Sequence, residues 1–163
     1  MASEIYTNLK VKLSESVNVD ATMIPVYLSN SANTTLTVST HSGKLLVVPD
    51  MTANNLSAIL PTPTRSGDTY RFVMKGPSAL QTNYIIKASE TATLFNGCVT
   101  LCETRDAPNL AVFATNTSSS NLQIVQPQAM EVLFTSANTT AYYVSGLVTG
   151  TGQGNGVAFY DRP

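Results

Sequence analysis

Charged residues are scarce in this sequence, and they do not cluster. They make up 12% of the 163 residues, about half of the usual ~25%, with nine basic and ten acidic side chains scattered singly. A chain without a block of like charge lacks the electrostatic footprint of a nucleic-acid-binding protein. No apolar run approaches the roughly 18 residues of a membrane helix, and the first residues contain no apolar core of a secretory signal. We therefore predict no direct contact with nucleic acid and none with a membrane.

Histidine, cysteine and tryptophan are also rare, which limits the available chemistry. His41 is the single histidine and lies in a polar turn, and the sequence has no Gly-x-Ser-x-Gly nucleophile motif. No tryptophan offers a sugar-binding platform beside the scattered acids, so the sequence does not indicate a glycosidase. Cys98 and Cys102 would lie about 13 Å apart along one strand face, beyond the ~7 Å that a disulfide allows. We predict two free, buried thiols, no enzyme activity, no catalytic or metal-binding residue and no cofactor.

Threonine, serine and asparagine supply most of the polarity, and apolar residues alternate with a period of two. Tyr70, Phe72 and Met74, for example, alternate with more polar neighbours. About a dozen short strands follow one another at spacings of roughly 8–12 residues, a pattern typical of all-β sandwiches and barrels. We predict an all-β, single-domain antiparallel fold, either a β-sandwich or a jelly roll. Residues 1–20 would be an N-terminal arm or first strand, and residues 21–163 would form the β-sandwich domain.

Turn residues predict how these strands connect. Asn96 and Gly97 form a dipeptide that favours a two-residue β-hairpin, and residues 137–140 indicate a polar hairpin tip. Residues 146–156 contain five glycines, but a strand follows them rather than the helix of a dinucleotide-binding motif. We interpret this stretch as a long flexible hairpin loop. Leu36 and Val38 alternate as in a strand.

The segment 56–75 joins an apolar strand to an alternating strand through a proline- and glycine-containing turn. Leu60, Tyr70 and Phe72 are its candidate core residues, and Pro61 and Gly67 are its turn residues. Its basic side chains would face outward, either as a patch for an acidic partner or as an ordinary solvated strand face. Within the same turn, an aspartate at position 68 either binds calcium with neighbouring loop oxygens or caps the turn.

Four groups of residues resemble small β-rich capsid-associated proteins of tailed phages and related double-stranded DNA viruses, over about residues 35–150. The matching residues are Ser42-Gly43-Lys44, Leu60-Pro61 with Gly67, Tyr70 and Phe72, Ile85-Ile86 with Phe95 and Gly97, and Tyr143 to Gly146. Such families often have tryptophan before the final Val-Ser-Gly, where this chain has Tyr142-Tyr143. The resemblance implies a head decoration or cement protein that binds the outside of a shell, often as a homotrimer.

This resemblance leads to specific expectations about partners and contact residues. The expected partner is the major capsid protein, and the expected location is the capsid surface of a virion assembled from protein made in the host cytoplasm. The segment 1–20 has alternating apolar residues and is either an ordinary first strand or an arm that reaches another subunit. The candidate capsid or subunit contacts are Ile5, Tyr6, Leu9, Val11, Arg65, Arg71 and Lys75.

An alternative function is also compatible with the sequence. The chain would then be a receptor- or glycan-binding β module of a viral fibre or spike. Its site would consist of exposed Tyr142 and Tyr160 together with the glycine-rich stretch 146–156.

Overall fold

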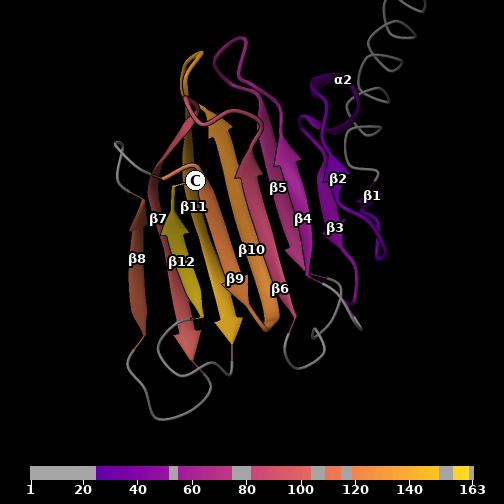
Figure 1. The fold of residues 1–163 in the computed structure, drawn as a ribbon, viewed down its shortest axis with the longest axis vertical. Coiled ribbons are helices and arrows are strands. Elements are labelled where there is room, and N and C mark those ends of the chain that lie inside the picture. The colour runs from indigo at the N-terminus through magenta and orange to yellow at the C-terminus, as the bar shows by residue number, and fades with distance from the viewer. Residues whose placement is uncertain are drawn as a thin grey trace, which may run out of the picture.

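The structure, a computed structural model, describes residues 25–51, 55–74, 82–103, 109–114, 119–150 and 156–161. These residues form almost entirely β-structure, in two sheets (Figure 1). The seven-stranded sheet has the order β1 (Val26–Tyr27), β3 (Leu45–Val48), β5 (Thr69–Met74), β10 (Pro127–Ser136), β11 (Ala141–Gly150), β7 (Leu94–Glu103) and β8 (Leu110–Ala114). The five-stranded sheet has the order β12 (Val157–Tyr160), β9 (Asn121–Val125), β6 (Asn83–Ala88), β4 (Leu56–Leu60) and β2 (Thr34–Thr35). The all-β prediction is confirmed.

The first six strands alternate between the two sheets. Within each sheet they pair in parallel, β1 with β3 and β3 with β5 on one side, and β2 with β4 and β4 with β6 on the other. Parallel neighbours need a crossover connection, and here the crossover is a strand of the opposite sheet. The antiparallel prediction is therefore wrong for half of the described pairs, because five of the ten are parallel. A jelly roll, which consists of antiparallel Greek keys, does not have this strand order.

Of the two hairpins predicted at Asn96-Gly97 and at residues 137–140, the structure confirms one and contradicts the other. Residues 137–140 do join two antiparallel neighbours, β10 and β11, so that hairpin is confirmed. The hairpin at Asn96 and Gly97 is wrong, because both residues lie inside β7, which runs parallel to β11. Gly97 has a φ of +130°, and a Cβ at this position would collide with the carbonyl oxygen of Val144. The glycine therefore permits a close backbone approach rather than a turn.

Two further predictions about local structure need correction. The glycine-rich stretch is not a loop at its start, since Gly146 and Gly150 belong to β11. A Cβ on Gly146 would lie 2.5 Å from the carbonyl oxygen of Glu131. The glycine therefore allows the backbone of β11 to lie this close to its partner strand β10. Residues 38–41 form a helical turn, α2 (Val38–His41), instead of continuing a strand. The ring Nδ1 of His41 accepts a hydrogen bond from the backbone N–H of Thr37 at 3.0 Å, which helps to close that turn.

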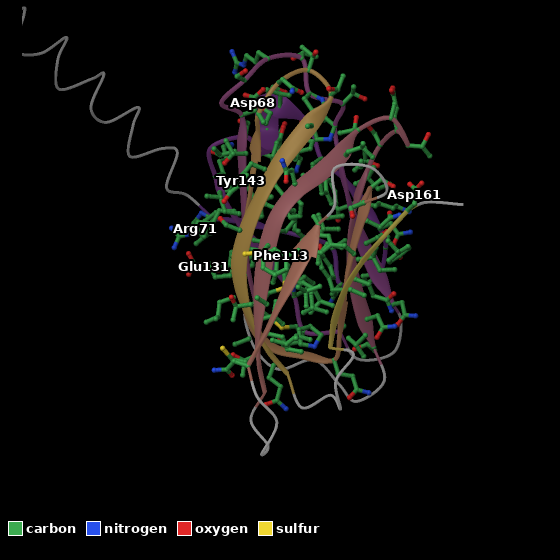
Figure 2. The ribbon with its side chains drawn as sticks, turned by 90° about the vertical axis from the view of Figure 1, so that its left-hand side faces the viewer. Asp68, Arg71, Phe113, Glu131, Tyr143 and Asp161 are labelled. Carbon is green, nitrogen blue, oxygen red and sulfur yellow. The ribbon has the colours of Figure 1, made fainter. Side chains whose placement is uncertain are left out.

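The two sheets share one hydrophobic core, and Figure 2 shows side chains filling the space between the two layers. Leu60, Tyr70 and Phe72 are fully buried, as predicted. Phe134 lies at the centre of an aromatic cluster, with its ring centroid 4.9 Å from that of Phe95 and 5.9 Å from that of Phe72. Edge-to-face contacts of this kind add to the stabilisation from area burial and fix the inner side of the seven-stranded sheet. The opposite side of each strand is thereby directed outward.

The predicted N-terminal arm lies outside the described residues. The division at residue 20 and the residues Ile5, Tyr6, Leu9 and Val11 stay predictions, as does Lys75, which also falls in an undescribed segment.

Candidate interaction surface

Strand register arranges the outward side chains of the seven-stranded sheet in rows. On the inner strands most of their sequence neighbours are buried in the core, and the pairing register carries the same side to the edge strands β1 and β8. One row runs across all seven strands through Tyr27, Val47, Val73, Glu131, Leu147, Thr100 and Ala111. The next row contains Leu45, Arg71, Leu133, Ser145, Cys98 and Phe113. We call these two rows, together with the neighbouring pairs Thr135–Tyr143 and Ala129–Thr149, the outer face.

The outer face carries an unusual amount of exposed apolar side chain. The described residues contain five exposed large apolar side chains, and all five belong to the seven-stranded sheet. Four of them lie on the outer face, namely Tyr27 (67% exposed), Phe113 (67%), Tyr143 (54%) and Leu147 (49%). Several large apolar side chains exposed on one face of a sheet indicate a site of interaction more strongly than side chains scattered over the whole surface do. The outer face is therefore the candidate functional site.

One ion pair lies in the middle of this apolar surface. Arg71 donates from Nε at 3.0 Å and from Nη2 at 2.7 Å to the same carboxylate oxygen, Oε1 of Glu131. Both side chains remain about half exposed, at 53% and 57%. Figure 2 shows the pair on the same side of the molecule as Tyr143. An exposed pair of this kind contributes only about 0–1 kcal/mol to stability, but it leaves the centre of the face without net charge.

Shallow depressions lie beside the ion pair. The larger, with a volume of about 310 Å³, is lined by Glu131, Leu133, Ser145, Gly146 and Leu147. The second shares Glu131 and Leu147 with it and extends towards Ala129 and Thr149. Both are open to the outside, so they suit protruding side chains of a partner better than an enclosed small molecule.

Arg65, a predicted contact residue, has a structural partner in the turn that precedes β5. Its guanidinium, which is 70% exposed, donates at 2.9 Å to the buried carboxylate of Asp68. Ser42 donates to the same carboxylate at 3.1 Å. The hydrogen bond from Arg65 is the main reason that the pKa of Asp68 lies below its usual value. Asp68 therefore holds this turn together.

Neither a cluster of metal-ligating side chains nor a membrane-spanning helix is found in the described part of the chain. No group of three or more histidine, cysteine, aspartate or glutamate residues is placed there to hold a metal ion. No described helix has both the length and the apolar character needed to cross a membrane.

The other predicted site residues are distributed as follows. Arg71 lies on the outer face, whereas Arg65 lies in the turn, and each has its own acidic partner. Tyr142, which the fibre or spike alternative needs as an exposed residue, is buried, and its hydroxyl donates at 2.8 Å to the carbonyl oxygen of Pro61. That part of the alternative is wrong. Tyr160 is half-buried at the end of β12.

The cysteines are free, as predicted, but they are only partly buried. Cys98 and Cys102 both alternate outward on β7, and the outward partner of Cys98 on β8 is Phe113. Cys98 therefore belongs to the outer face, and Cys102 lies next to that face as the pairing partner of Thr149.

The exposed apolar residues that define the outer face were not predicted from the sequence. The alternation of β11 places Tyr142 and Tyr143 on opposite sides of the strand, but it does not say which of the two is exposed. The exposure of Phe113 could not be predicted either, because every residue of β8 is apolar and the sequence does not distinguish one side of the strand from the other.

No protein-family model matches this chain, and no curated protein matches it.

Proposed function

We propose that this chain is a structural protein of a virion, a two-sheet β-sandwich that binds the outer surface of the viral capsid and stabilises the shell. The observation that carries the proposal is the outer face, with four exposed large apolar side chains around one internally neutralised ion pair. The sequence resemblance to head decoration and cement proteins supports the choice of a capsid as the partner. The chain would act as a homotrimer on the major capsid protein, without catalysis.

The chemistry of the outer face suits one protein surface binding another. Its side chains are apolar, hydroxyl-bearing or thiol-bearing, apart from the Arg71–Glu131 pair. Such a surface gains free energy mainly by removing apolar area from water, about 25 cal/mol per Å². A protein that binds only the assembled shell stabilises that shell by mass action. No reacting group is required for this function.

The test is binding of the full chain to shells assembled from the major capsid protein of the same virus. Replacing Leu147→Lys places a charge at the centre of the outer face and should weaken shell binding about ten-fold or more. The matched control is Gln123→Lys, which adds the same charge to the outward side of the five-stranded sheet. Co-sedimentation with shells measures both, and circular dichroism checks that both variants remain folded.

Electron microscopy of decorated shells gives the location. Extra density at three-fold or quasi-three-fold positions would support the proposal. Density confined to a tail or fibre, or undiminished shell binding by the Leu147→Lys variant, would contradict it.

A further inference from the structure

Strand β8 forms one edge of the seven-stranded sheet, and this edge lacks the usual protection (Figure 1). Within the described part of the chain it pairs only with β7, and its sequence is Leu-Ala-Val-Phe-Ala, without a charged residue or a proline. Natural sheets usually protect their edges with charges, prolines or very short strands. Leu110, Ala111 and Phe113 are exposed. A five-residue apolar edge of this kind can accept a further strand.

The other described edges differ from β8. At the opposite end of the same sheet, β1 has two residues, and β2 at one edge of the five-stranded sheet also has two. Strand β12, at the other edge of that sheet, has four residues, and none of its side chains is exposed. Strand β8 is therefore the described edge that is best suited to pairing with another strand.

The row of β8 that faces the core is incomplete at this edge. Leu110 pairs with Leu101 on β7, and Leu101 is 1% exposed. Leu110 lies on the same side of the sheet but is 47% exposed, because no described strand lies beyond it. A strand added beside β8 would remove part of this apolar surface from water, which is favourable.

Two copies of β8 are complementary to each other when they run antiparallel. With a two-fold axis perpendicular to the sheet between the two Val112 residues, Leu110 lies opposite Ala114 of the second copy. Ala111 then lies opposite Phe113 of the second copy. Each of these pairs brings a large side chain next to a small one, and each residue stays on the side of the sheet that it occupies in the single chain. The strand therefore matches itself in side-chain size, in the absence of charge and in sidedness.

We infer that β8 of one copy of this chain pairs with β8 of a second copy in this antiparallel register, so that the two seven-stranded sheets form one continuous sheet. Main-chain hydrogen bonds between the strands supply the affinity, and the matched side chains set the register. The inference goes beyond the proposed function, because a two-fold contact is distinct from the contacts that close a trimer. It places the outer faces of two copies side by side on the same surface of the combined sheet.

The first experiment tests the register by disulfide formation in the full chain. Two variants both carry Cys98→Ala and Cys102→Ala, and one adds Val112→Cys whereas the other adds Leu110→Cys. Two chains with Val112→Cys would have the new Cβ atoms about 5 Å apart across the axis, within the range for a disulfide after slight adjustment. Two chains with Leu110→Cys would have them offset by four residues, roughly 13 Å along the strands.

Mild oxidation should therefore link the Val112→Cys chains into dimers on a non-reducing denaturing gel and leave the Leu110→Cys chains unlinked. No linkage through position 112, or equal linkage through position 110, would overturn the inference.

The second experiment tests whether the edge holds two copies together. Leu110→Lys places a charge where pairing would cover it, so this change should halve the particle mass measured by light scattering. Leu147→Lys is the matched control, because Leu147 has nearly the same exposure, 49% against 47%, but lies on the outer face of β11 away from the edge. The control should leave the mass unchanged, and circular dichroism checks that both variants are folded. A particle mass that Leu110→Lys does not change would overturn the inference.

Neither measurement uses shells, so the two proposals fail separately. A β8-linked dimer that does not bind shells would refute the proposed function alone. A chain that binds shells but does not form this dimer would refute the inference alone.

Discussion

Two neighbouring buried tyrosines offer a sharp test of the core, because their hydroxyl groups have opposite surroundings. The rings of Tyr70 and Tyr142 pack edge to face with centroids 6.0 Å apart. The Tyr142 hydroxyl donates to the carbonyl oxygen of Pro61 at 2.8 Å. The Tyr70 hydroxyl is buried and makes no hydrogen bond of good geometry within the described residues, although the neighbouring Tyr142 hydroxyl acts to lower its pKa. Burial raises the pKa of Tyr70 to about 12, and the nearby Asp68 carboxylate acts in the same direction.

Replacing each tyrosine by phenylalanine should therefore change stability in opposite directions. Tyr142→Phe removes a hydrogen bond, which we expect to lower the free energy of unfolding by about 1 kcal/mol. Tyr70→Phe removes a buried hydroxyl whose desolvation is uncompensated, a cost of about 1–3 kcal/mol. Loss of the oxygen's packing contacts offsets part of that gain, so we expect Tyr70→Phe to raise the free energy of unfolding by about 1 kcal/mol. The two variants should thus differ by about 2 kcal/mol.

Urea denaturation followed by circular dichroism measures this difference, provided that the slope of the transition is the same in both variants. Comparable destabilisation by the two replacements would refute the reasoning, because it would mean that the Tyr70 hydroxyl makes a hydrogen bond as strong as that of Tyr142. The double variant adds a check. If the hydroxyls act independently, the two changes should sum to within about 0.5 kcal/mol.

The remaining predictions concern a glycine and a carboxylate. Gly97→Ala should destabilise the protein by about 3 kcal/mol, since the new Cβ meets the Val144 carbonyl oxygen, whereas Gly67→Ala, also at positive φ but in open space, should cost about 1–2 kcal/mol in urea denaturation. The folded-state pKa of Asp68 is depressed chiefly by its hydrogen bond with Arg65, so its stabilising contribution is present above its ordinary pKa near 4 and is lost as the pH falls through the folded-state value. Asp68→Asn should therefore weaken the acid dependence of unfolding below about pH 4, and an unchanged acid titration would contradict this.

Alternation in the sequence was sufficient to find strands and to identify parts of the core. Tyr70 and Phe72 were predicted to be buried from their spacing alone, and they are. Such residues are readable because the period of two is a local property of an extended chain with one side in the core. The same local pattern also predicted that the chain would be almost entirely β.

The pairing partners of the strands could not be predicted from the local sequence pattern. The dipeptide Asn96-Gly97 has the composition of a tight turn, but the glycine is needed for the approach of β7 to Val144, a neighbour that no local pattern reveals. The alternation of β1 to β6 between two sheets likewise depends on contacts between strands that are not consecutive in the chain. Local turn chemistry can predict a bend, but it cannot say which sheet the next strand joins.

The outer face was missed for a related reason. The alternation places Tyr142 and Tyr143 on opposite sides of β11, but it does not say which side meets the second sheet. That choice is made by the whole inner layer, where Phe134 and its aromatic neighbours collect. The Arg71–Glu131 pair was also invisible, since the two residues are brought together only by the pairing of β5 with β10.

The strand order has a consequence for how the chain folds as it leaves the ribosome. Strands β10 and β11 are synthesised late, yet they fill the middle of the seven-stranded sheet, between β5 and β7. Until both have emerged, β5 and β7 each have an open edge and the two halves of that sheet are not joined. A nascent chain that stalls before residue 127 would therefore have two separate groups of strands, β1-β3-β5 and β7-β8, instead of one shortened sheet. The unpaired edges of β5 and β7 would be prone to aggregation. For this protein, quality control during translation should depend most on the final quarter of the chain.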